Sequence, residues 1–185
     1  MKLSKILVLM FAVFVMSCGK EGGADKAANA TADSMKTAAK AMYAAFSSGD
    51  MAALDKYITS DYKEHSLSPG QKPGLDGLKE WMTMMKAGYS DLKFTTEDIR
   101  CDGDMCISRV RFSATNTGPM MGMPPTNKKV DVMFIDMMRW NNGKFVEHWG
   151  YGEEMKMMTQ LGLMPPMGEA PPAETGAPAA AAEKK

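Results

Sequence analysis

The sequence has no excess of charge of either sign, because 22 lysine and arginine residues balance 22 aspartate and glutamate residues. It also lacks a cluster of basic residues interleaved with aromatic residues. Nucleic-acid binding depends on basic patches of that kind, so we expect no nucleic-acid partner.

A long apolar run at the N-terminus is lacking as well. The run Ile6–Val15 is shorter than the roughly 20 residues that a transmembrane helix needs. It follows the positive residues Lys2 and Lys5. A positive start before a short apolar run is typical of a signal peptide, which we predict at residues 1–17.

The apolar run ends in Val15-Met16-Ser17-Cys18, which resembles the bacterial lipobox. The resemblance implies that Cys18 is acylated and anchors the chain to a membrane, since each buried CH₂ contributes roughly 0.8 kcal/mol. An ordinary signal peptide with an incidental cysteine is the alternative. Gly19 follows Cys18, at the position where an aspartate would favour retention in the inner membrane. We therefore expect the protein to be anchored in the bacterial cell envelope, at the outer membrane.

Two segments have few apolar residues to bury. Residues 18–31 are rich in glycine, alanine and charged residues, which predicts a flexible tether. Residues 164–185 are rich in proline and alanine, which predicts a disordered tail. Residues 32–163 remain, and their length suits one domain.

Apolar spacing within this domain predicts helices first and strands afterwards. The expected helices are 32–47, 51–58 and 76–87, with a short strand at 62–65 and longer strands at 93–101, 105–117, 129–140 and 144–151. Asn142-Gly143 is a strong signal for a two-residue hairpin. Helices grouped before an antiparallel sheet predict an α+β fold.

Two cysteines flank a second predicted hairpin. If Gly103 and Asp104 form a two-residue turn, Cys101 faces Cys106 in a non-hydrogen-bonded pair, where Cα atoms approach to about 4.5 Å. This separation suits a disulfide, and export would permit oxidation. Two free thiols are the alternative. A metal site is not expected, because no histidine lies nearby.

Short motifs follow one another through most of the domain. They are Phe46-Ser47-Ser48-Gly49-Asp50, Asp61-Tyr62-Lys63-Glu64-His65, Pro73-Gly74-Leu75-Asp76-Gly77-Leu78, Tyr89-Ser90-Asp91-Leu92, Gly122-Met123-Pro124-Pro125-Thr126, Glu147-His148-Trp149 and Gln160-Leu161-Gly162. Their order resembles the SnoaL-like polyketide cyclase, or ester cyclase, branch of the nuclear-transport-factor-two-like fold. The resemblance implies a cone of curved antiparallel sheet packed on N-terminal helices, a pocket between them, and no metal or organic cofactor.

The resemblance also implies candidate catalytic residues. Cyclases of this branch close a ring by an aldol step with a carboxylate as general acid and base, and burial can tune its pKa. The family's pattern is His-Trp, three further residues and then an aspartate. In this sequence the pattern begins at His148 and ends at Glu153, so a glutamate replaces the aspartate. The longer side chain can displace the carboxylate by about 1 Å, which lowers catalytic rates strongly. Helix capping is the alternative for Glu153, and a structural role is the alternative for His148.

Regular pairing across Asn142-Gly143 places Met137 opposite His148 and Arg139 opposite Val146. The resemblance puts the arginine and histidine positions toward the pocket. The concave face would then hold Met133, Ile135, Met137, Arg139, Val146 and His148. The outer face would hold Phe134, Asp136, Met138, Trp140, Phe145, Glu147, Trp149 and Tyr151, and this aromatic face would suit a homodimer.

We therefore expect His65, Trp81, Met137 and Arg139 to contact a ligand. His65 could instead face solvent, and Trp81 could belong to the core. Arg139 could be neutralised by a carboxylate rather than hold a substrate anion. The 21 methionines also raise the possibility of Cu(I) binding, but most sit at core spacing, so we expect no metal site.

Two functional hypotheses remain open. In the first, which the sequence favours, an exported lipoprotein holds a small, largely apolar molecule in its pocket. In the second, the domain is a cofactor-independent ester cyclase, or another aldol- or isomerase-type enzyme, in which Glu153 or His148 moves protons. Fold resemblance does not decide between them.

Overall fold

The computed structural model describes residues 21–165, so the predicted signal peptide, Cys18 and most of the predicted tail lie outside them. The elements are α1 (Glu21–Ser48), the 3₁₀ helix η1 (Met51–Lys56), β1 (Ile58–Glu64), α2 (Gly74–Gly88), β2 (Tyr89–Asp102), β3 (Met105–Asn116), β4 (Lys129–Asn141), β5 (Lys144–Gly152) and α3 (Glu154–Leu161). The α+β prediction is confirmed. Within residues 21–165, no helix combines the length and the apolar character needed to cross a bilayer.

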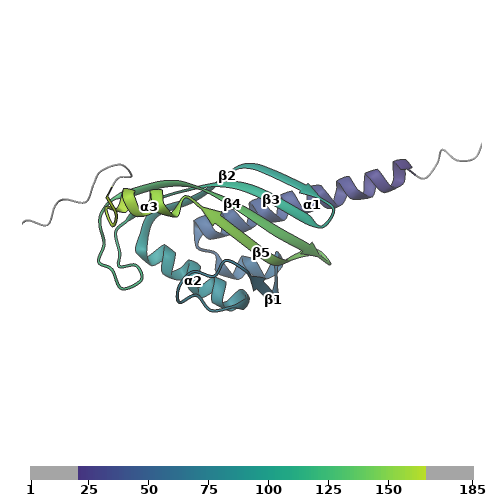
Figure 1. Ribbon diagram of the computed structural model, residues 1–185. Coiled ribbons are helices and arrows are strands. Elements are labelled where there is room, and N and C mark those ends of the chain that lie inside the picture. Colours follow the sequence, from purple (N-terminus) through teal and green to yellow (C-terminus); the bar gives the residue numbers. More distant parts are fainter. Residues whose placement is uncertain (1–20, 166–185) are drawn as a thin grey trace, which may run out of the picture.

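The five strands form one sheet in the order β1-β5-β4-β3-β2. Strand β1 runs parallel to β5, and the other neighbours are antiparallel. Figure 1 shows β2 to β5 as a long curved layer, with α1 and α2 on one side of it. The cavity described below lies between this curved sheet and the helices.

Helix α1 is longer than predicted. It begins at Glu21, so residues 21–31 are helical where the sequence predicts an irregular tether. Alanine is the strongest helix former, and this stretch is rich in it. Figure 1 shows the first part of α1 projecting past the end of the sheet. Six apolar residues recur at helical spacing within the predicted helix 32–47, and all six are buried: Met35, Ala38, Ala39, Met42, Ala45 and Phe46.

The second predicted helix is shorter than expected. Asp50 caps the 3₁₀ helix η1 by accepting a hydrogen bond from the amide of Ala53 at 3.2 Å. The chain then enters β1 at Ile58, which pairs with Phe145, and the amide of Phe145 donates to the Tyr57 carbonyl at 2.8 Å. Long-range sheet pairing therefore replaces the last helical turn that local spacing predicts.

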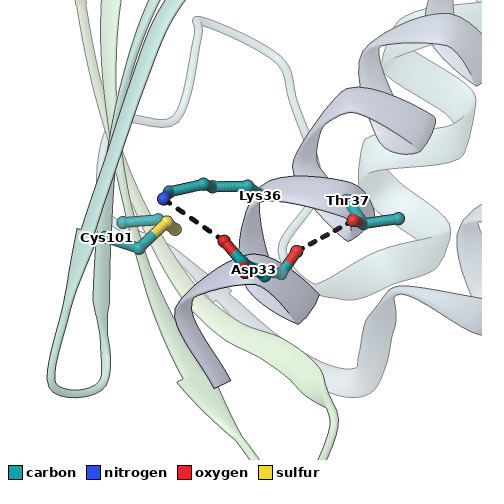
Figure 2. The surroundings of a disulfide bond; sticks show 5 residues. Asp33, Lys36, Thr37 and Cys101 are labelled. Carbon is teal, nitrogen blue, oxygen red and sulfur yellow. Dashed lines mark hydrogen bonds and ion pairs between the residues drawn. A yellow bond between two sulfur atoms is a disulfide. The ribbon is translucent and has the colours of Figure 1, made fainter. Parts of the chain in front are cut away.

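The cysteine hairpin forms as predicted. Cys101 pairs with Cys106 in the β2–β3 register, their Cα atoms are 4.1 Å apart, and a disulfide joins them. Figure 2 shows Cys101 beside the α1 residues Asp33, Lys36 and Thr37. The Lys36 ammonium lies 3.5 Å from the Asp33 carboxylate, and the Thr37 hydroxyl donates to the Asp33 carbonyl at 2.8 Å. The disulfide thus lies where the hairpin end approaches α1.

The β4–β5 hairpin departs from the predicted pairing after its first residues. Asn141 pairs with Lys144, as predicted. The register then shifts by one residue, so Arg139 pairs with Glu147 and not with Val146. Val146 is the extra residue of a β-bulge, which reverses the alternation of side chains beyond it.

The bulge changes which side chains share a face. His148 pairs with Met138, and Met137 pairs with Trp149, so the predicted partnership of Met137 with His148 is wrong. The face toward the helices holds Val130, Val132, Phe134, Asp136, Met138, Phe145 and His148. Much of the face that the sequence assigns to a homodimer is therefore turned inward.

Candidate functional site

A cavity of about 310 Å³ lies between the inner face of the sheet and the helices. Methionine and aromatic side chains dominate its lining, among them Met42, Phe46, Trp81, Met82, Met85, Met120, Phe134 and Met138. The volume suits a small organic molecule, and the apolar walls favour an apolar one.

The chain between β3 and β4 forms part of the cavity lining, through residues such as Met120, Met123 and Pro124. Buried Asn116 holds this segment, because its amide nitrogen donates to the carbonyls of Gly88 and Gly118 at 3.0 and 2.9 Å. Its amide oxygen accepts from the backbone of Thr126 at 2.7 Å. A single side chain thus ties the end of α2 to the loop that carries Met120 into the cavity wall.

The polar wall of the cavity is a cluster of three charged side chains. The Nδ1 atom of His148 lies 2.7 Å from Glu64 Oε2, and its Nε2 atom lies 3.3 Å from Asp136 Oδ1. The side chains of Glu64, Asp136 and His148 are only 5%, 13% and 20% exposed. The imidazole therefore bridges two carboxylates that are largely removed from water.

Two tyrosines and one amide complete this cluster. The Tyr43 hydroxyl donates to Asp136 Oδ2 at 2.7 Å, and the Tyr62 hydroxyl donates to Glu64 Oε2 at 2.8 Å. The amide of Ser66 donates to Glu64 Oε1 at 2.9 Å. We call Tyr43, Tyr62, Glu64, Asp136 and His148 the polar wall.

The charges and hydrogen bonds of the polar wall shift the pKa values of His148 and Glu64. Burial acts to lower the pKa of His148, but the hydrogen bonds and charges of Asp136 and Glu64 outweigh it and raise this pKa to about 9. Burial acts to raise the pKa of Glu64, yet its bonds with His148, Ser66 and Tyr62 leave it below its ordinary value. At neutral pH an imidazolium therefore lies beside an ionised Glu64.

The tyrosines remain protonated donors. Burial and the negative charge of Asp136 raise the pKa of Tyr43 well above its ordinary value. Burial and the charge of Glu64 do the same for the pKa of Tyr62. Neither phenol can therefore act as a base at neutral pH. Among the side chains that the structure describes, those of residues 31–165, no group of three or more histidine, cysteine or acidic residues has the arrangement of a metal site.

The model of the SnoaL-like polyketide cyclase family matches residues 36–161, which is more than half of the chain. The chain belongs to the SnoaL-like polyketide cyclase family. The motifs that carry the resemblance in the sequence lie within this range or at its edge.

The chain is also similar to individual proteins. The nogalonic acid methyl ester cyclase of Streptomyces nogalater is 25% identical over 124 residues, which are 65% of this chain and 92% of that enzyme. TsrD from Streptomyces laurentii is 26% identical, with a TM-score of 0.67 over 71% of this chain and 97% of TsrD. IdmH from Streptomyces antibioticus is 28% identical, with a TM-score of 0.62 over 69% and 98% of the two chains.

Of the two candidate catalytic residues, His148 lines the cavity and Glu153 does not. Glu153 precedes α3, where its Oε2 atom accepts from the amide of Met133 at 2.9 Å and from the Lys156 ammonium at 2.8 Å. These two bonds lower the pKa of Glu153. The contacts tie the start of α3 to β4. Glu153 stands at the N-cap position of α3, as the helix-capping alternative expects, but its side chain makes no capping hydrogen bond to that helix.

Of the four expected ligand contacts, only Trp81 lines the cavity. Arg139 pairs with Asp104 at 2.6 Å and approaches Glu147 at 3.8 Å on the outer face. His65 stacks on Trp149 with ring centroids 4.4 Å apart. Met137 pairs with Trp149 on that same face, because the bulge reverses the expected alternation. The cavity placement inferred for Arg139, His65 and Met137 is therefore wrong.

Four members of the polar wall were missed by sequence reasoning. Tyr43 looks like one more core residue of α1, while Glu64 stands between Lys63 and His65 in a polar stretch typical of solvent-facing residues. An acidic residue flanked by large apolar residues, as in Phe134-Ile135-Asp136-Met137-Met138, was the one available signal. Charged residues are rarely buried without a partner, so that pattern indicates a buried pair.

Proposed function

We propose that this SnoaL-like protein is exported, anchored to the bacterial cell envelope through Cys18, and binds a small, largely apolar molecule in its cavity. The observation that carries the binding function is the cavity of about 310 Å³, in which methionine and aromatic side chains adjoin the polar wall. The Val15-Met16-Ser17-Cys18 motif supports the anchor. A tethered binding domain suits capture or delivery of such a molecule at a membrane.

Binding is tested by filling the cavity. Met138 is 1% exposed and lines the cavity, whereas its neighbour Met137 faces the other side of the sheet. Met138→Trp should abolish binding of the neutral fluorescent probe N-phenyl-1-naphthylamine, because the larger side chain occupies the space. The matched variant Met137→Trp should bind the probe as the parent does. Equal binding by both variants would contradict the proposal.

Native mass spectrometry of the protein purified from its own host provides a second test. A small molecule retained in the parent and absent from Met138→Trp would identify the cavity's occupant. Retention by both variants would place the molecule elsewhere on the protein.

An ester cyclase activity is the second candidate, because His148 lies in the cavity between two carboxylates and could give and take a proton there. The similarity to the nogalonic acid methyl ester cyclase favours this chemistry. Incubation with nogalonic acid methyl ester should then give a ring-closed product, and His148→Gln should abolish it while the neutral probe still binds. Loss of turnover in Glu153→Gln with full turnover in His148→Gln would contradict the role of His148.

A further inference from the structure

The charge balance of the cavity narrows the class of ligand, an inference that rests on the proposed binding function. Four charged side chains line the cavity: Glu64, Asp136, His148 and Glu154. Among the described residues, no lysine or arginine lines it. With His148 protonated the three carboxylates leave a net negative charge, and with His148 neutral the charge is more negative still. The sign therefore does not depend on the state of the histidine.

The hydrogen-bonding capacity of the polar wall also favours a ligand that carries a hydrogen-bond donor. Both nitrogens of His148 face carboxylates, and the hydroxyls of Tyr43 and Tyr62 already donate to Asp136 and Glu64. Each carboxylate oxygen can accept about two hydrogen bonds, so both oxygens of Asp136 retain accepting capacity. The wall has spare acceptors and no spare donor, and a ligand must bring the donor itself.

We propose that the cavity selects lipophilic cations: small molecules with an apolar ring or chain and one protonated amine that donates to Asp136. An anionic head group would meet like charges in a largely dehydrated place, where repulsion is poorly screened. A neutral alcohol can donate one hydrogen bond but brings no charge. We therefore expect the affinity order amine, alcohol, carboxylate for ligands that share one ring system.

The test compares three ligands built on naphthalene: 1-naphthylmethylamine, 1-naphthylmethanol and 1-naphthoic acid. Each ligand is titrated against N-phenyl-1-naphthylamine bound to the full chain at pH 7, and the displacement curve gives its affinity. We expect the amine to bind at least about tenfold more tightly than the acid, with the alcohol between them. Equal or tighter binding of the acid would overturn the inference while leaving the proposed binding function intact. Failure of all three ligands and of the probe would instead refute the binding function.

Two aspartates of the same strand provide matched variants. Asp136→Asn removes one charge from the polar wall, and Asp131→Asn removes one from the outer face, where Asp131 pairs with Arg111 at 3.1 Å. Asp136→Asn should reduce the amine-to-acid ratio about tenfold, and Asp131→Asn should leave it unchanged. The alcohol serves as the control for folding, because its binding depends little on charge. If Asp136→Asn does not fold, Glu64→Gln is measured in its place; an unchanged ratio in the folded variant that binds the alcohol overturns the inference.

Discussion

Removing the imidazole of His148 should destabilise the protein strongly, in a way that depends on pH. In His148→Ala, Glu64 keeps Tyr62 and the Ser66 amide, and Asp136 keeps Tyr43, but both lose the positive charge between them. Breaking a buried ion pair by removing one partner typically costs about 3–5 kcal/mol. We expect a loss in the free energy of unfolding of this order at pH 7.

The pH dependence of the parent protein follows from the same geometry. The pKa of His148 is about 9 in the folded state, compared with about 6.5 in an unfolded chain. A raised pKa means that the stabilisation is complete below pH 6.5 and is lost as pH rises through 9. A shift of this size corresponds to roughly 3 kcal/mol. The pKa of Glu64 is lowered in the folded state, so this carboxylate stabilises the protein at pH values above its ordinary pKa. That stabilisation is lost as the pH falls through the lowered pKa.

Urea unfolding followed by tryptophan fluorescence between pH 4 and 10 measures the loss of stability in His148→Ala and the alkaline loss of stability in the parent protein. The parent should lose stability between pH 6.5 and 9, and His148→Ala should lack this step. His65→Ala is the matched control, since the sequence has two histidines and His65 is 38% exposed beside Glu147. We expect it to cost about 1 kcal/mol or less. A loss below about 1 kcal/mol in His148→Ala at pH 7, or an unchanged step at alkaline pH, would refute the reasoning.

Three further predictions address other parts of the chain. Peptide mapping without reduction should find Cys101 joined to Cys106, and labelling of both as free thiols in exported protein would contradict the bridge. Cys18→Ser should leave the exported protein soluble without detergent, whereas persistent membrane attachment would contradict the lipid anchor. Arg139→Gln should change the free energy of unfolding by about 1 kcal/mol or less, because its ion pairs are half-exposed, and should leave probe binding unchanged; weakened probe binding would return Arg139 to the site.

Local patterns alone determined much of this protein. The hairpin turn between Gly103 and Asp104 sets Cys101 opposite Cys106 whatever the rest of the chain does. Apolar spacing similarly identified the buried face of α1, since it depends on the helical period. The order of helices and strands as far as β5, and with it the α+β class, follows from the same short-range periodicities, whereas α3 has no counterpart among the predicted helices.

The polar wall was decided by tertiary structure. Its members come from α1, β1, β4 and β5, and no spacing within one element brings Glu64 and His148 together. Two long-range features do so: the parallel pairing of β1 with β5, and the one-residue bulge at Val146 that turns His148 inward. A bulge reverses the alternation of every residue beyond it, so pairing read outward from the turn assigned Arg139 to the wrong face. The hydrogen bonds and charges that the fold brings together then outweigh burial and shift the pKa values of His148 and Glu64, which no residue type carries by itself.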